Sequence, residues 1–156
     1  MNSFIKKLVL FLFINFGSLA LGGLLMNDGP QAAWYNSLEK APWTPPGWVF
    51  GFAWTTIMLC FSVYLAFLFL KRNDLPLKIL FIIQVILNIS WNYFFFNIHW
   101  VKFAMFILIS LTVVVYIFLF AFRKEMKWLS LLILPYAIWL LVACSLNLYF
   151  IMNNEI

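Results

Sequence analysis

Residues 34–54 read WYNSLEKAPWTPPGWVFGFAW and join two long apolar runs. The stretch holds four tryptophans and three prolines. The segment Thr44-Pro45-Pro46-Gly47 is not helical throughout, because a residue before proline is driven toward extended backbone and glycine permits a turn. We therefore predict about two turns of interfacial helix over 33–40, a rigid loop, and a new helix that begins at Gly47 or Trp48.

This connection is longer than two adjacent antiparallel helices require. Such helices are usually joined by about 2–8 residues. The connection here covers residues 27–47, more than twice that length. A long loop stiffened by proline and rich in aromatic side chains is suited to cover a cavity mouth, and we expect it to do so.

The composition indicates a protein whose solvent is largely lipid. The chain is 66% hydrophobic and 10% charged, whereas a soluble domain has roughly 25% charged residues. A helix needs about 20 apolar residues to cross the hydrocarbon core, and each backbone amide must be satisfied within the helix. We predict an all-α membrane protein, a five-transmembrane-helix bundle, forming one domain over 1–156 with the loop 27–47 capping a cavity. The predicted spans are 4–26, 48–70, 77–96, 101–122 and 128–152.

The first run resembles a secretory signal, since Lys6 and Lys7 precede it and Ser18-Leu19-Ala20 looks like a cleavage site. Its apolar stretch continues through Leu21 to Leu25, which is too long for a signal core. We therefore keep this run as the first transmembrane helix.

The positive charges predict the orientation. With five crossings, eight of the ten cations fall on the side of the amino terminus, and only Lys40 and Lys102 fall on the other. Cytoplasmic loops are enriched in Lys and Arg. We expect the amino terminus in the cytoplasm of a bacterial plasma membrane, with the first loop and the carboxyl terminus outside. Scattered over short connections, these charges do not indicate nucleic-acid binding. The eight are Lys6, Lys7, Lys71, Arg72, Lys78, Arg123, Lys124 and Lys127.

Ionisable side chains are absent from the middle of every predicted span, which argues against a proton-coupled transporter or ion pump. The single histidine, His99, is interpreted as an interfacial side chain rather than a ligand. Cys60 and Cys144 are interpreted as buried free thiols. We predict no metal site and no cofactor. Pro135 removes an amide donor inside the last run and is expected to kink it near Leu131.

Three helical stripes combine large aromatic or soft side chains with neutral polar ones. If the stripes converge, they line one pocket. The alternative is that the amides form interhelical hydrogen bonds and the tryptophans are belt residues. Trp54, Trp91 and Trp139 lie several residues inside their spans, which weakens that alternative. The stripes are Gln84, Asn88, Trp91 and Asn92; Trp139, Ala143, Leu146 and Asn147; and Trp54, Met58 and Phe61.

Three signatures resemble the tryptophan-rich sensory protein or translocator protein family (TspO/MBR, the peripheral-type benzodiazepine receptor). The first-loop signature is followed by Trp54, and the chain departs from it where Ala41 stands in place of the usual proline. The cholesterol-binding consensus requires a Lys or Arg after the tyrosine, and the final helix has neither after Tyr149. We therefore predict no dedicated sterol site there. The signatures are Trp34, Tyr35, Leu38, Lys40, Trp43, Pro45 and Pro46; Gln84, Asn88, Trp91, Phe95 and Phe96; and Pro135, Tyr136, Trp139, Ala143, Leu146 and Asn147.

The resemblance implies a capped cavity that binds protoporphyrin and isoquinoline or benzodiazepine drugs. It implies a protein that senses or transports porphyrins. A homodimer is a further possible partner, because dimers are seen in the family. Indole faces stack on flat conjugated rings, and neutral amides orient them. Carried over residue by residue, the predicted binding residues are Tyr35, Pro45, Trp54, Met58, Asn88, Trp91, Trp139, Ala143 and Leu146.

Two other functions stay open at this point. One is an enzyme that degrades protoporphyrin in light and oxygen, with Trp54 and Trp139 as candidate catalytic residues. No general acid, base or metal site is readable for ordinary hydrolysis, so the porphyrin and light must supply the reactive species. The other is a membrane scaffold without a ligand, which leaves the deep tryptophans and the long loop unexplained.

Overall fold

The computed structural model describes residues 2–155. Within them the chain is helical, with five helices long and apolar enough to cross a membrane. The predicted all-α bundle of five membrane-crossing helices is confirmed. The elements are α1 (Ser3–Leu24), η1 (Gly29–Gln31), α2 (Ala33–Ser37), α3 (Gly47–Lys71), α4 (Leu75–Asn92), η2 (Tyr93–Asn97), α5 (Val101–Ala121), α6 (Arg123–Met126), η3 (Lys127–Ile133) and α7 (Leu134–Asn153).

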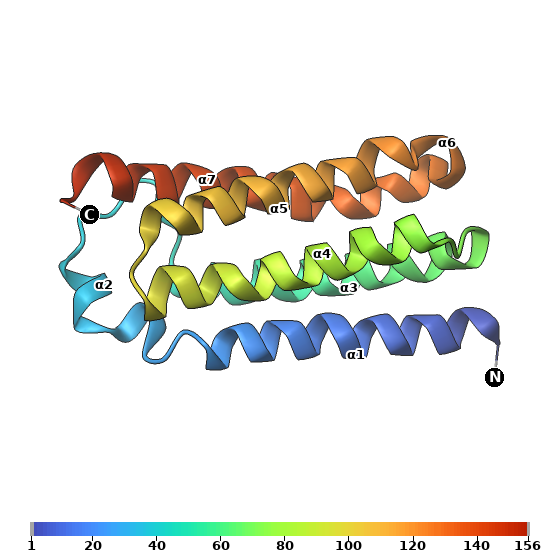
Figure 1. The fold of residues 1–156 in the computed structure, drawn as a ribbon, viewed down its shortest axis with the longest axis horizontal. Helices are drawn as coiled ribbons and strands as arrows, with labels where there is room; N and C mark the ends of the chain where they lie inside the picture. Colours follow the sequence, from blue (N-terminus) through green and yellow to red (C-terminus); the bar gives the residue numbers. More distant parts are fainter. Residues whose placement is uncertain (1, 156) are drawn as a thin grey trace.

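The long helices run side by side in one bundle (Figure 1). Helix α1 packs on α3 and α4, and α5 packs on α4 and α7. The carboxyl terminus and the α1–α3 loop lie at one end of the bundle, and the amino terminus lies at the other. We call these the loop end and the charged end. Large apolar side chains cover the outside, such as Phe13 at 79% and Phe106 at 65% exposed, which suits an integral membrane protein surrounded by lipid.

The charged end contains the eight cations that the sequence places on the amino-terminal side, since they lie at the start of α1, the α3–α4 connection and the α5–α7 connection. Arg72 pairs with Asp74 and, at 3.5 Å, with Glu125. The Arg72 guanidinium lowers the pKa of Asp74 below its ordinary value, helped by the Leu77 N–H, which donates to the Asp74 carboxylate that caps α4. Lys40 and Lys102 lie at the loop end.

The core near the charged end is closely packed. Phe61, Tyr64, Leu65 and Phe118 are all fully buried, and the Phe118 ring meets that of Phe61 edge-on at 5.4 Å. The Tyr64 hydroxyl donates to the Phe118 carbonyl oxygen at 2.7 Å, which joins α3 to α5. Buried polar groups inside lipid need such partners, because water does not satisfy them there.

The α1–α3 loop follows the predicted course in outline. Helix α2 is shorter than the expected 33–40, because it ends at Ser37 and the backbone is extended at Leu38. A turn closes where the Thr44 N–H donates to the Ala41 carbonyl at 2.9 Å. Pro46 is the N-cap of α3, so the helix begins at Gly47, one of the two predicted starts. Proline is accepted at a helix start because the first amides have no partner there.

Helix α4 does not continue to Phe96 as an α-helix. It ends at Asn92 and passes into the π-helical turn η2, in which the Ile98 N–H donates to the Tyr93 carbonyl at 3.1 Å. A π turn spans five residues instead of four. Phe95 and Phe96 can therefore both pack beside the Trp91 ring, at 5.2 and 5.9 Å between ring centroids.

The predicted span 128–152 is not one continuous α-helix. Residues Lys127–Ile133 form the 3₁₀ segment η3, and α-helix starts only at Leu134, with Pro135 in its first turn. Proline has no N–H to donate to the Leu131 carbonyl and its ring crowds that turn. The break expected near Leu131 thus takes the form of a change from 3₁₀-helix to α-helix at Ile133.

Candidate functional site

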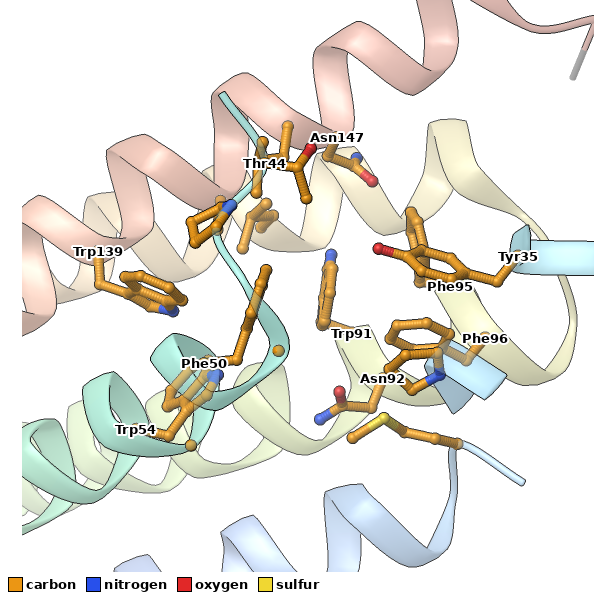
Figure 2. A pocket seen from close by; sticks show the side chains of 18 of the residues that line it. Tyr35, Thr44, Phe50, Trp54, Trp91, Asn92, Phe95, Phe96, Trp139 and Asn147 are labelled. Atoms are coloured by element: carbon orange, nitrogen blue, oxygen red, sulfur yellow. The ribbon is translucent and has the colours of Figure 1, made fainter. Parts of the chain in front are cut away.

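A cavity of about 660 Å³ lies under the α1–α3 loop at the loop end of the bundle. Pockets for drug-sized ligands are roughly 300–1,000 Å³ and mostly apolar. The wall comes from the loop and from every long helix, and Figure 2 shows aromatic side chains on several sides of the hollow. The site is therefore formed only when the whole bundle and the loop are in place.

Eight of the nine predicted binding residues line this cavity, and one does not. Met58 is 1% exposed and packs in the core of the bundle. It shares a helical stripe with Trp54 but lies one turn farther from the loop, where the helices have closed on one another. The eight are Tyr35, Pro45, Trp54, Asn88, Trp91, Trp139, Ala143 and Leu146.

Three indoles from three different helices face the cavity (Figure 2). Trp54 in α3 meets the Tyr136 ring edge-on at 6.0 Å, and Trp139 in α7 meets the Phe50 ring edge-on at 5.3 Å. Trp91 in α4 is stacked on Phe95. Edge-on and stacked neighbours hold an aromatic ring in a definite orientation. The indole faces are thus fixed before any ligand enters.

A buried hydrogen-bond chain lies beneath the cavity. The Gln84 amide donates to the Tyr136 hydroxyl at 2.9 Å, and that hydroxyl donates to the Asn88 Oδ1 at 3.1 Å. All three side chains are buried, but only Asn88 reaches the cavity wall. The chain joins α4 to α7 and turns the Asn88 carbonyl toward Tyr136. Gln84, the first member of the predicted stripe, supports the site and does not line it.

Polar atoms on the wall lack partners. Thr44 Oγ1, Trp91 Nε1 and Asn147 Oδ1 are buried and have no hydrogen-bond partner within residues 2–155. Figure 2 shows the three residues around the hollow. An unpaired buried donor or acceptor costs roughly 1–3 kcal/mol. These atoms belong to residues of the cavity wall but have almost no accessible surface, so they lie behind the wall and are not open to the hollow.

The loop is attached to the carboxyl-terminal part of α7. The Glu39 N–H donates to the Asn154 Oδ1 at 2.8 Å, and the Asn154 amide donates to the Glu39 carbonyl at 3.1 Å. The Tyr149 hydroxyl donates to the Glu39 carboxylate at 2.9 Å, and the Trp43 indole donates to the Ser145 hydroxyl at 3.1 Å. These contacts join residues more than one hundred positions apart.

The same loop is attached on its other side to the α4–α5 connection. Trp34 stacks on the His99 ring at 3.8 Å, and Tyr35 packs against Phe96 at 5.4 Å. His99 has a φ of 62°, in the left-handed region that non-glycine residues rarely adopt. Its ring is held by the stacked indole of Trp34, and its interfacial role stays a prediction.

Several lining residues were not in the predicted site. Phe95 and Phe96 belong to a signature, but their inward placement depends on the π turn. Phe50 and Thr44 carried no signal in the sequence. Asn147 was on the predicted stripe of the last helix, and its amide inside an apolar span was the sequence feature that could have identified it as a lining residue. Among residues 2–155, no group of three or more His, Cys, Asp or Glu side chains lies close enough to bind one metal ion.

The fold and this cavity define an integral membrane protein of five spanning helices with a lidded, aromatic hollow. Comparison with known families assigns it further. The model of the TspO/MBR family matches residues 8–152. The chain belongs to the TspO/MBR family.

Known proteins are similar in sequence to this chain over most of their length. Protein CrtK of Rhodobacter capsulatus is 35% identical over 120 residues, covering 74% of each chain. Tryptophan-rich protein TspO of Chlorobaculum tepidum is 30% identical over 142 residues, covering 87% of this chain and 90% of its own. The translocator protein of Ovis aries is 30% identical over 133 residues, covering 81% of this chain and 78% of its own.

Proposed function

We propose that the cavity binds protoporphyrin or a similar flat conjugated ring, and that the protein senses or transports such ligands. The observation that carries this proposal is the convergence of Trp54, Trp91 and Trp139 on one cavity of about 660 Å³. Indole faces stack on flat conjugated rings, and an apolar wall removes them from water. Several relatives are named tryptophan-rich or translocator proteins, which agrees with a tryptophan-lined ligand site.

The cavity itself supports a ligand more strongly than it supports a scaffold. A protein with a purely structural role has no use for a hollow of about 660 Å³, because unfilled space inside a bundle costs stability. Isoquinoline and benzodiazepine drugs are proposed ligands of the same cavity, since they are flat and apolar with few polar groups.

Quenching of tryptophan fluorescence by protoporphyrin in detergent tests the proposal. The variant W54F/W139F removes two cavity indoles, and the variant W48F/W128F removes two indoles that are 73% and 72% exposed. We expect saturable quenching in the wild type and in W48F/W128F, and weaker affinity in W54F/W139F. Equal, non-saturating quenching in all three proteins indicates partition into the micelle and contradicts the proposal.

A second candidate function is degradation of protoporphyrin in light and oxygen, favoured by the presence of two readily oxidised indoles, Trp54 and Trp139, on the same cavity wall. Illumination with and without oxygen tests it. Degradation requires that bound porphyrin bleach faster than free porphyrin in the same detergent, and that W54F/W139F slow it. Equal bleaching rates for bound and free porphyrin exclude this function and leave binding intact.

We further propose that the protein lies in a bacterial plasma membrane with its amino terminus in the cytoplasm. The support is the collection of eight Lys and Arg residues at the charged end. Ser37 lies on the loop side and Lys124 on the charged side, and both are exposed. A membrane-impermeant thiol reagent should label Ser37→Cys on intact cells, and Lys124→Cys only after permeabilisation. The reverse pattern overturns the orientation, and the unsubstituted protein reports the background from Cys60 and Cys144.

A further inference from the structure

One charged side chain reaches the cavity wall. Of the residues that line the cavity, only Lys40 is ionised at neutral pH. Among the described residues, Lys40 lies in the loop between α2 and α3 that covers the hollow, and its side chain lines the cavity. The remaining wall is aromatic, aliphatic or neutral polar. A single cation in such a wall is a directional feature, because it distinguishes one end of a bound ligand from the other.

The positive charge of Lys40 is not neutralised by the protein. Its Nζ lies 4.7 Å from the centroid of the Tyr35 ring and 3.3 Å from the Asn36 Oδ1, and neither neighbour carries a charge. Within residues 2–155, Lys40 forms no salt bridge with an acidic side chain. The adjacent Glu39 turns its carboxylate to the Tyr149 hydroxyl instead.

The Lys40 ammonium lies over the ring of Tyr35, which also lines the cavity. A cation over an aromatic face is attracted by the ring, and this Tyr35 ring is itself packed against Phe96 and Phe150 at 5.4 and 5.7 Å. Burial raises the pKa of Tyr35 above its ordinary value, so its phenol stays neutral and does not pair with Lys40 as an anion. The cation is therefore positioned and still available to an anionic group on a ligand.

The surroundings favour a carboxylate as that anionic group. One ammonium with neutral neighbours matches a single negative charge, whereas a phosphate normally needs several cations or amide donors around it. A carboxylate on a flat ring allows the ring to lie among the indoles while its charged edge remains at Lys40. The neutral side chains of Asn88, Trp91 and Asn147 line other parts of the wall around the ring.

On the basis of the function proposed above, we propose that Lys40 is a specificity-determining residue that selects flat aromatic carboxylic acids. The ligand lies with its carboxylate toward the loop and its ring between the aromatic side chains of the helices. Neutral esters and amides of the same ring enter the cavity without this contact. The selection is electrostatic and adds to the binding that the cavity provides by shape.

Two matched probes test the role of Lys40: protoporphyrin IX, which carries two carboxylates, and its dimethyl ester, which carries none. Affinities for both are measured by fluorescence quenching in one detergent at neutral pH. The comparison uses the wild type, K40M, K40R and K102M. Lys102 is the other cation at the loop end and does not line the cavity, so K102M changes net charge equally without touching the site. Partition of each probe into the micelle cancels when variants are compared for the same probe.

We expect K40M to weaken binding of the acid by about threefold to fivefold, as for a partly exposed ion pair, and to leave the ester unchanged. K40R should retain the affinity for the acid within about twofold, because guanidinium also pairs with carboxylate. K102M should change neither affinity. The unchanged ester affinity of K40M shows that its cavity is intact, and K40Q serves as a second neutral variant if K40M does not fold.

Three results overturn the inference. If K40M weakens acid and ester equally, Lys40 supports the loop and does not recognise the carboxylate. If K102M reproduces the effect of K40M, the general surface charge is responsible. If both probes bind saturably and K40M changes neither, the proposed function stands and the selection by Lys40 fails. Absence of saturable binding of either probe to the wild type removes the proposed function itself, and the role of Lys40 falls with it.

Discussion

The two ends of the bundle are built from the same helices and differ in packing. At the charged end, side chains such as Tyr64, Phe118 and Leu65 are fully buried and fill the space between helices. At the loop end, the helices surround a cavity of about 660 Å³. Three of the five buried polar atoms without partners in residues 2–155 belong to residues that line that cavity. The charged end thus supplies stability, and the loop end leaves room for a ligand.

The difference has a local cause in α3. Its first turns carry Gly47 and Gly51, which line the cavity and have no other atom within 4 Å of the position a Cβ would occupy. Farther along the helix the inward positions are Ile57, Met58 and Phe61, each at most 1% exposed. A helix with small residues at one end and large ones at the other closes the bundle at one end only.

The largest expected effect is at the charged end. Phe118→Ala removes a fully buried ring that contacts Phe61, Tyr64 and Phe122, and should lower the free energy of unfolding by about 3–5 kcal/mol. Denaturation in detergent measures it. Phe120→Ala, on the same helix but 59% exposed, is the control and should have little effect. A similar loss in both variants contradicts the view that packing at this end carries the stability.

The second largest effect is expected on ligand affinity at the loop end. Gly51→Leu puts a side chain into open space in the cavity, so it should reduce protoporphyrin affinity at least about tenfold, or 1.4 kcal/mol, without destabilising the helix. Gly17→Leu, at an exposed position of α1 that is equally open, is the control. Fluorescence quenching and thermal denaturation are measured together. Unchanged affinity in Gly51→Leu means that the ligand does not occupy this part of the hollow.

A smaller loss of stability is expected between the two ends, at the hydrogen-bond chain beneath the cavity. Tyr136→Phe removes the hydroxyl that accepts from Gln84 and donates to Asn88, and should cost about 1 kcal/mol of stability. It also frees Asn88 on the cavity wall, so ligand affinity should change as well. Tyr116→Phe, whose hydroxyl has no partner within residues 2–155, is the comparison variant. If stability falls and affinity does not, the chain supports the fold alone.

The smallest expected effect is on the loop attachment. Asn154→Ala removes the two hydrogen bonds with the Glu39 backbone, so amide hydrogen exchange in residues 33–46 should accelerate by about twofold to tenfold. Exchange in the buried part of α3 should not change. Asn153→Ala is the matched control, because its side chain bonds only to the Tyr149 carbonyl of its own helix. Equal exchange in both variants shows that the Asn154 hydrogen bonds do not limit the opening of the loop, which its other contacts then hold.

The arrangement of tryptophans shows how far the sequence could predict the site. Trp54, Trp91 and Trp139 lie too deep in their spans for belt residues, and the structure brings all three to one cavity. The same reasoning about stripes placed Met58 on the wall and failed there, because a helical stripe gives direction and does not give depth. Whether the bundle is open or closed at a given turn depends on the neighbouring helices, and no single segment contains that information.

The sequence by itself determined that the chain has five helices able to cross a membrane, that the loop ends where α3 begins at Gly47, and which side chains share a helix face. These features follow from hydrocarbon thickness, proline chemistry and helical period, all of which act locally. Only the tertiary structure decided the π turn that turns Phe95 and Phe96 inward, the attachment of Glu39 to Asn154, and the position of Lys40 on the cavity wall. Those features depend on contacts between residues far apart in the chain, whose energies exist only after the helices have assembled.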